Sequence, residues 1–287
     1  MRDDVAKRID LYIKKMPSLP TSVNKVLEEC NNPNTSPADL NHVITLDPVL
    51  VGRVLKLINS AYYGLGQPIS NLVRAIIMLG VNTVKNLALS SAIMETFSEN
   101  MDIAGLDMEG FWRHSLCVGV SAKLLAQKRN IEPKLREEYF TAGLLHDIGK
   151  IPLNAVLHKD YALTLGTADR DRTSLNLAEE RTLGLDHCTV GALIVKAWKL
   201  DGAVGDAIMY HHNYADYYGS HQDVLYSVLV ANRFASLGSI GFSGNRHPNR
   251  IEKPLWEALG VDQDFFNEEI EEIVKEEIEK AKVFLNI

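Results

Sequence analysis

Histidine and aspartate side chains near the ends of helical segments are the residues of this chain best suited to chemistry. Nine histidines are present, and two adjacent pairs stand out, His146-Asp147 and His211-His212. Adjacent residues of a helix point about 100° apart, so both members of a pair reach one cleft only near a helix end. The pairs therefore predict a cleft between helices into which several of these side chains point.

Three further residues are placed to join that cleft. His114 lies on the apolar face of one segment, His187 follows Asp186 at the start of another, and Asn232 lies inside a third. A histidine taken singly is more often an ordinary core or surface residue, which leaves a purely structural role open. Because imidazole with carboxylate suits Fe, Mn, Zn or Ni, we expect a divalent transition metal, or two ions bridged by Asp147.

The two residues that follow the His-Asp dipeptide add to this prediction. Gly149 permits close approach of another backbone, and Lys150 beside a metal would hold an anionic oxygen as a point charge. The alternative for Lys150 is a solvated surface lysine. A metal ion would lower the pKa of a bound water towards neutrality, so Asp147 and Lys150 are the catalytic candidates if the site is active.

The elements that must position these side chains read as helices throughout, which predicts an all-α fold. Apolar residues recur at helical spacing, and no alternation typical of a strand is strong enough to predict one. Asp47-Pro48 suits the start of one helix, Gly80 the end of the next, and Asn82 the N-cap of a third. Helices are predicted over residues 47–64, 70–79, from 83, 111–128, 135–145, 174–183, 187–200, 203–212, 224–237 and 266–285.

Three less regular segments divide these helices. Residues 99–108 are the best boundary between an N-terminal helical lobe, 1–105, and a second helical domain, 106–287. Residues 154–173 have weak periodicity and predict a short helix plus a loop, and the polar residues 238–249 predict a mobile surface loop. The C-terminal helix has an apolar stripe that either closes the fold or forms a homodimer contact.

Composition excludes several classes of protein. A net charge of −7 argues against general affinity for nucleic acid or anionic membranes. The three cysteines are far apart and form no C-x-x-C pair, which favours buried thiols in a reducing compartment. Neither a signal peptide nor an apolar run of about 20 residues is visible. We therefore expect a cytoplasmic protein that does not insert into a membrane.

The motifs around these residues resemble a known family. The string from Gly143 to Lys150, with His114 upstream and His211-His212 downstream, resembles the HD superfamily of metal-dependent phosphohydrolases. The remaining motifs narrow this to the HDOD (HD-related output domain) family over roughly residues 16–240. They are 46–48, 54–61, 68–69, 75–76, 79–80, 180–181, Gly184, 186–187, 190–192, 198–200 and 231–232.

This resemblance implies an all-helical bacterial signalling module, often one whose hydrolase site has decayed. Residue by residue, it implies metal ligands at His114, His146, Asp147, His187, His211 and His212. Two departures count against hydrolysis. Asn232 stands where the superfamily has a last aspartate ligand, and a neutral amide binds a hard dication more weakly. The Gly-Tyr-Pro signature of cyclic-dinucleotide phosphodiesterases is missing after His212.

Two functions follow as expectations. The first is a regulatory output module that acts through an unidentified signalling protein, with a retained metal site and a nucleotide as a conceivable ligand. The second is an active metal-dependent phosphohydrolase acting on a nucleotide or phosphoester. In that case the metal activates water and Lys150 stabilises the developing charge. The Asn232→Asp substitution discriminates between them, because it restores the carboxylate of the active enzymes.

Overall fold

The structure is a computed structural model that describes residues 3–32, 34–98 and 106–286. Every regular element among them is a helix, which confirms the all-α prediction. The first six helices are α1 (Asp3–Lys15), α2 (Thr21–Cys30), α3 (Pro37–Thr45), α4 (Pro48–Ile58), α5 (Leu72–Leu79) and α6 (Val81–Ser98). The next nine are α7 (Met108–Lys128), α8 (Arg136–Leu145), α9 (Lys150–Asp171), α10 (Leu175–Leu183), α11 (His187–Trp198), α12 (Ala203–Tyr210), α13 (Gln222–Leu237), α14 (Lys253–Leu259) and α15 (Glu268–Ala281).

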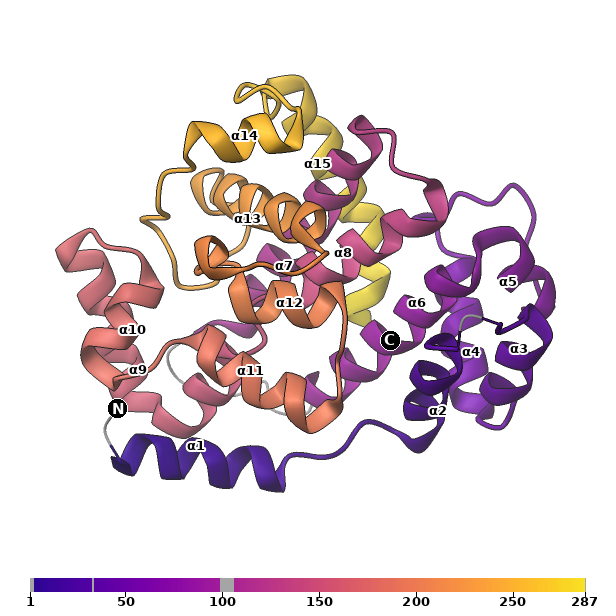
Figure 1. The fold of residues 1–287 in the computed structure, drawn as a ribbon, viewed down its shortest axis with the longest axis horizontal. Coiled ribbons are helices and arrows are strands. Elements are labelled where there is room, and N and C mark those ends of the chain that lie inside the picture. Colours follow the sequence, from indigo (N-terminus) through magenta and orange to yellow (C-terminus); the bar gives the residue numbers. More distant parts are fainter. Residues whose placement is uncertain (1–2, 33, 99–105, 287) are drawn as a thin grey trace.

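The N-terminal helices α2 to α5 form a lobe beside α6, at the right of Figure 1. Asp47 caps α4 by accepting hydrogen bonds from the Val49 and Leu50 amides, as its position before Pro48 predicts. The prediction for α6 was wrong by two residues. The Val84 amide donates to the Gly80 carbonyl, so the helix begins directly after Gly80 and Asn82 lies in its first turn. Helices α1 to α3 were not predicted.

Helices α7 and α8 pack against each other at the centre of the second part, where α7, α8 and α13 meet (Figure 1). A Cβ atom on Gly143 of α8 would lie 2.7 Å from the Cα of Gly119 in α7. Only two glycines allow the backbones to come this close. The close packing places the middle of α7 beside the C-terminal end of α8, where His146 follows.

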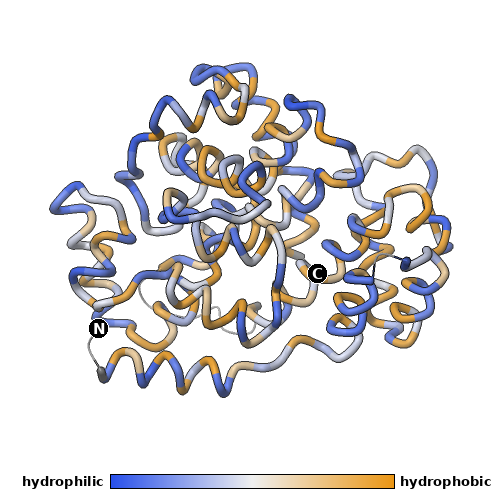
Figure 2. Tube along the Cα trace, in the orientation of Figure 1, coloured by the Kyte–Doolittle hydropathy of each residue, from blue (hydrophilic) through white to orange (hydrophobic). Residues whose placement is uncertain are grey.

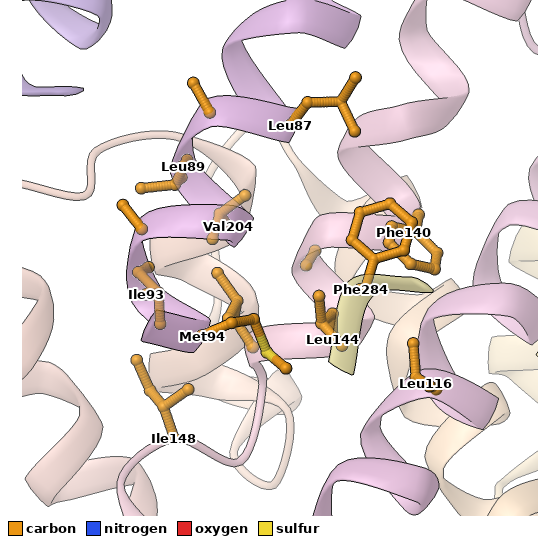
Figure 3. Close-up of a cluster of buried hydrophobic side chains, with 14 of the residues drawn as sticks. Leu87, Leu89, Ile93, Met94, Leu116, Phe140, Leu144, Ile148, Val204 and Phe284 are labelled. Atoms are coloured by element: carbon orange, nitrogen blue, oxygen red, sulfur yellow. The ribbon is translucent and has the colours of Figure 1, made fainter. Parts of the chain in front are cut away.

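One continuous apolar core joins the N-terminal lobe to the second part. Helix α6 contributes Leu87 and Ile93 to it, α8 contributes Phe140 and Leu144, and Phe284 closes it from the C-terminus (Figure 3). Apolar and polar residues alternate along the helices of both parts (Figure 2), as expected of helices that bury one face. The predicted boundary at residue 105 lies outside the described residues.

One prediction about the irregular segments was wrong. Residues 154–171 belong to the long helix α9, which is broken only at Leu157 (φ −113°, ψ 20°) and ends at Asp171. Its periodicity is weak because polar side chains such as Asn154 and Thr164 are buried along with the apolar ones. Residues 238–249 form an irregular, partly exposed loop, as predicted, and part of this loop is packed against the fold, while its mobility stays a prediction. The Phe242 amide donates to the Gly110 carbonyl at 2.8 Å, and Ser243 and Asn245 are buried.

The terminal helices hold the second part from two sides. Helix α1 packs on α9 and α11, with Val5 and Ile9 buried in a small cluster of its own. Helix α15 packs on α7 through Val274 and Ile278, so its apolar stripe closes the fold, while a homodimer contact stays a prediction. Among the described helices none alone is long and apolar enough to cross a membrane; α5 and α6 reach that measure only together, bent by 114°.

Candidate metal centre

Five helices bring the predicted site residues together in the second part of the chain. His114 comes from α7, His146-Asp147 from the end of α8, His187 from the first residue of α11, His211 from the end of α12, and Asn232 from α13. All six are buried, and His212 is half-buried beside them. The cleft predicted from the paired residues is therefore present, and each side chain enters it from a helix end or a buried helix face.

Gly149 determines how closely α11 approaches the His-Asp corner. A Cβ atom at this position would lie 1.9 Å from the carbonyl oxygen of His187 and 2.7 Å from the amide nitrogen of Gly191. Any larger residue would push the start of α11 away. The close backbone approach predicted for this glycine is therefore observed. It allows the first residue of α11, His187, to lie beside Asp147.

Hydrogen bonds fix the direction of three imidazoles. The Nδ1–H groups of His146 and His211 donate to the carbonyls of Gly143 and Ala207 at 2.7 and 2.9 Å. The Nδ1 of His187 lies 2.5 Å from the Glu179 carboxylate, which also accepts the His187 amide at 2.9 Å. With each Nδ1 protonated, the opposite nitrogen, Nε2, presents its lone pair to the cleft.

Three acceptor atoms face one another at the centre of the cleft. The His187 and His211 Nε2 atoms are 3.2 Å apart, and they lie 3.3 and 3.4 Å from Asp147 Oδ1. That oxygen has no hydrogen-bond partner among the described residues, although it is buried. Such a cluster of lone pairs is costly unless a cation lies between them.

The size of this triangle fits a transition metal. Metal bonds of about 2.0–2.1 Å in a tetrahedral site place neighbouring ligands roughly 3.3 Å apart. The three observed separations agree with that spacing. The Glu179–His187 pair adds the carboxylate–histidine arrangement that orients metal-binding imidazoles. The residues present therefore fit one divalent transition metal held by Asp147, His187 and His211.

The other side of Asp147 is arranged differently. Its Oδ2 lies 3.2 Å from His146 Nε2, which is a second buried atom without a hydrogen-bond partner. However, the Lys150 ammonium lies 2.6 Å from the same oxygen and 3.3 Å from the Ser243 hydroxyl. The interpretation of Lys150 as a solvated surface residue is wrong, since its side chain is 1% exposed. An ammonium ion therefore already supplies positive charge on this side.

Asn232 hydrogen-bonds to His114, whose Nε2 lies 3.0 Å from its Oδ1. The amide oxygen accepts, so the His114 Nε2 carries a proton and has no lone pair to offer. His114, His146 and Asp147 are close enough together to hold an ion, but in this arrangement two of their ligand atoms are engaged by Asn232 and Lys150. Six of the seven predicted residues thus form one open triangle and one largely satisfied group, and His212 belongs to neither.

The charge states of His114, His211 and Asp147 are those of metal ligands, whereas His187 is protonated at neutral pH. Burial lowers the pKa of His114 to about 3 and that of His211 to about 4. Burial disfavours the charged form of Asp147, but His146 and Lys150 hold its pKa well below the usual range. Burial opposes the charge on His187, yet Glu179 raises its pKa to about 9. Neutral imidazoles and an ionised carboxylate are the forms that bind metal, so His187 would have to release its Nε2 proton when an ion binds.

No pattern in the sequence identifies two of the residues at this site. Glu179 lies eight positions before His187 on another helix, and Ser243 lies in a segment whose composition predicts a free loop. Both reach the centre through tertiary packing alone. Cys188 is also close to His211, with its sulfur 3.6 Å from Nδ1 and 3.9 Å from Nε2, and it forms with His187 and His211 a second group of side chains close enough to hold an ion.

Comparison with known proteins agrees with this architecture. The HDOD domain family matches residues 16–214. A crystal structure from Geobacter sulfurreducens, described as an HDOD domain protein with unknown function, superposes with a TM-score of 0.73 at 26% identity, over 98% of both chains.

Two other solved structures share the fold alone. A candidate phosphohydrolase from Shewanella amazonensis SB2B has a TM-score of 0.69 at 23% identity, over 96% of this chain and 98% of its own. A candidate signal transduction protein from Marinobacter aquaeolei VT8 has a TM-score of 0.74 at 22% identity. The match covers 99% of this chain and 66% of that protein's chain. An uncharacterized protein from Treponema pallidum (strain Nichols) is 23% identical over 229 residues, and the chain spans 43% of that relative's length.

Proposed function

The chain belongs to the HDOD family, and from that premise we propose that it is a regulatory signalling module whose centre binds one divalent transition metal without catalysing hydrolysis. The ion, chosen from Fe, Mn, Ni or Zn, would connect α8, α11 and α12 through Asp147, His187 and His211. When bound, it would supply a fixed positive charge between these helices. The output would pass to a signalling protein that contacts the helical surface.

The ammonium of Lys150 on Asp147 Oδ2 is the observation that carries this proposal. Phosphoester cleavage at two-metal sites relies on a pair of ions about 3.5–4 Å apart. Here Lys150 provides one positive charge on that side, and Asn232 engages His114 where a further carboxylate would be needed. Only the triangle at Oδ1 remains open. The residues therefore favour a structural or sensing metal over a hydrolytic pair.

A metal-dependent phosphohydrolase is the second candidate. It is favoured by the Glu179–His187 pair, which orients a ligand as in catalytic sites, and by a cavity that reaches His211 and Asn232. In such an enzyme Lys150 would hold an anionic oxygen of the substrate. Asp147 would be a metal ligand.

Metal stoichiometry and turnover separate the two candidates. Protein stripped with chelator is titrated with Zn²⁺, Mn²⁺ or Fe²⁺, and bound metal is counted by elemental analysis. We expect one ion per chain, no binding in Asp147→Asn, and no hydrolysis of p-nitrophenyl phosphate or its bis-ester. Two ions together with turnover that is lost in Asp147→Asn would overturn the proposal and establish the hydrolase.

The substitution Asn232→Asp tests why the site is silent. Because a carboxylate adds one negative charge beside His114, we expect this variant to bind a second ion. Leu229→Asn, which changes another residue on the same helix near the cavity, serves as the control. A second ion in the control, or none in Asn232→Asp, would show that Asn232 does not limit metal binding.

A further inference from the structure

A small cavity adjoins the metal centre. Its volume is about 50 Å³, and the residues that line it include His211, His212, Asn232, Arg233 and Arg250. Since one water-sized group needs roughly 10–15 Å³, the space suits a group with a few heavy atoms. None of the described residues that line it is acidic. Size and charge together suit a small anion such as a phosphate group.

The two arginines bring uncompensated positive charge to this cavity. The Arg233 Nη1 donates to the carbonyls of Pro248 and Asn249 at 3.1 and 2.6 Å, so carbonyls, and no carboxylate, hold the guanidinium in place. Arg250 forms no hydrogen bond or ion pair with the described residues. Burial, and then the nearby charge of Arg250, lower the pKa of Arg233. Two neighbouring guanidiniums that form no ion pair with the described residues are typical of sites for planar or tetrahedral anions.

A larger cavity shares both arginines with the small one. Its volume is about 470 Å³. It is lined by aromatic side chains, of which Phe234 and Phe266 stack with ring centroids 4.1 Å apart and Trp256 is half-buried. Flat apolar surfaces of this kind bind the flat part of a ligand through stacking and burial.

Two acidic residues restrict what the larger cavity can hold. Asp264 and Glu271 belong to its wall, whereas the small cavity has no acid among its described lining residues. A second phosphate on the ligand would meet these carboxylates and be repelled. The charge distribution therefore favours a single phosphate at the metal-centre end and an uncharged remainder at the aromatic end.

We propose that the two cavities form one binding site for a phosphomonoester that carries a flat apolar group. The phosphate lies in the small cavity between Arg233 and Arg250 and faces Asn232, and the apolar group lies against Trp256 in the larger cavity. The proposal deepens the function proposed above by naming the ligand class of the regulatory module, and it rests on that function only for its biological meaning. The binding itself needs neither turnover nor a bound metal.

Calorimetric titration with phenyl phosphate tests this site. Inorganic phosphate and phenol are titrated separately, because each represents one half of the ligand. We expect phenyl phosphate to bind more tightly than either half. Arg250→Gln should weaken phenyl phosphate about tenfold or more, as expected for loss of a hydrogen bond between charged groups. This arginine is exposed and makes no internal hydrogen bond in the described chain, so its replacement leaves the fold intact.

Arg246→Gln is the matched control. Arg246 belongs to the same segment but pairs with Asp169 and lines neither of the two cavities. Tryptophan fluorescence gives a second readout, because Trp112 and Trp198 are buried and Trp256 alone of the three borders the site. Phenyl phosphate should change the emission of the unaltered chain and of Arg246→Gln, and Trp256→Phe should abolish that change.

The proposal is overturned if phenyl phosphate does not bind at millimolar concentration, or if Arg250→Gln and Arg246→Gln bind it equally well. Each titration is run on chelated and on metal-loaded protein, which separates this proposal from the one before it. Phosphomonoester binding in a chain that takes up no metal would support the site and refute the metal-dependent function. Metal uptake without phosphomonoester binding would do the reverse.

Discussion

Glu179 sets the orientation of His187, and through it the geometry of the ligand triangle. Its carboxylate accepts from both the backbone and the ring of His187, and the Tyr161 hydroxyl donates to its other oxygen at 2.8 Å. All three groups are buried, so the arrangement has little freedom to relax. A partner of this kind fixes the imidazole tautomer and raises its basicity as a ligand.

We therefore predict that Glu179→Gln weakens metal binding without removing a ligand. Loss of such a partner typically lowers metal affinity about 10- to 100-fold. The affinity is measured by competition against a chromophoric zinc chelator. Glu180→Gln is the control, because this neighbour is exposed. Equal affinities of the two variants would contradict the role given to Glu179.

The sequence allows the site to be predicted only where neighbours along the chain carry the signal. His146-Asp147 and His211-His212 are visible as pairs at helix ends, and His187 follows an N-cap aspartate. The burial of Lys150 and the contact of Glu179 with His187 depend on helix packing between distant segments. No local spacing rule encodes either contact. The types of residue at the site were therefore predictable. It was not predictable that Lys150 contacts Oδ2 of Asp147 while Oδ1 has no hydrogen-bond partner among the described residues.

At the scale of the elements, the helices that could be predicted are those with strong local start and stop signals. Asp47-Pro48 begins α4 and Asp186 caps α11, as their types predict. Helix α9 was missed because burial on several sides hides its periodicity, and α1 to α3 were not predicted although α3 begins with a capping box of Ser36 and Asp39. Tertiary packing decides an element such as α9, whose local pattern is weak.

Asp47 offers a test of such a local signal. Besides capping α4, its carboxylate accepts a hydrogen bond from the Ser22 hydroxyl at 2.7 Å. Asp47→Ala should therefore reduce the free energy of unfolding by about 1–2 kcal/mol at neutral pH. Urea unfolding measures the loss. Asp10→Ala, which removes an exposed partner of Lys14, should change stability by less than about 0.5 kcal/mol.

The contribution of Asp47 should also depend on pH. The Ser22 hydroxyl and then the Leu50 amide hold the pKa of Asp47 below its ordinary value, against a smaller effect of burial. A lowered folded-state pKa gives stability that is present above the unfolded value of about 3.9 and is lost as the pH falls through the folded value. The difference between the unaltered chain and Asp47→Ala should shrink below about pH 4. A difference that grows on acidification would refute this assignment.

Lys123 joins the N-terminal lobe to α7 and α8. Its ammonium donates to the Glu137 carboxylate at 2.7 Å and to the Tyr62 hydroxyl at 3.0 Å, and it lies 4.3 Å from the centroid of the Tyr62 ring. Glu137 is almost fully buried, with 3% of its side chain exposed, and its Oε1 has no partner among the described residues. The carboxylate therefore depends on Lys123 for compensation of its charge.

Lys123→Met should destabilise the chain by about 2–4 kcal/mol, because it leaves a buried carboxylate unpaired and removes the contact with Tyr62. The double variant Lys123→Met/Glu137→Leu should recover much of that loss, since an apolar pair needs no charge compensation. Denaturant unfolding gives both values, with the exposed Lys128→Met as control. If the double variant is less stable than Lys123→Met, the explanation by an unpaired charge is wrong.

At the scale of the whole molecule, the core does not separate into two lobes. Leu87 and Ile93 of α6 pack in the same cluster as Phe140 of α8 and Val204 of α12 (Figure 3). The Trp198 indole of α11 donates to the carbonyl of Pro17, in the segment between α1 and α2. Helices on both sides of the predicted boundary at residue 105 therefore share one core, and the division itself stays a prediction.

A continuous core has a consequence for metal binding. An ion that binds the folded chain alone stabilises it by about 2.7 kcal/mol when free metal is 100 times the Kd. One kcal/mol corresponds to roughly 2–4 °C in the melting midpoint of a chain of about this size. The ligand triangle lies on α8, α11 and α12, which share the core with α6. Metal should therefore raise the midpoint of the entire chain by about 5–10 °C.

Two probes report on whether the whole chain responds. Circular dichroism at the helix band follows all helices, and Trp198 fluorescence in a Trp112→Phe/Trp256→Phe background follows the place where α11 meets Phe97 of α6, with ring centroids 5.5 Å apart. Both probes should give one transition that moves by the same amount on adding Zn²⁺, and Asp147→Asn should remove the shift. Two transitions, of which only one moves, would mean that the N-terminal lobe unfolds independently. In that case a signal at the metal centre would have no route through the core to α2–α5.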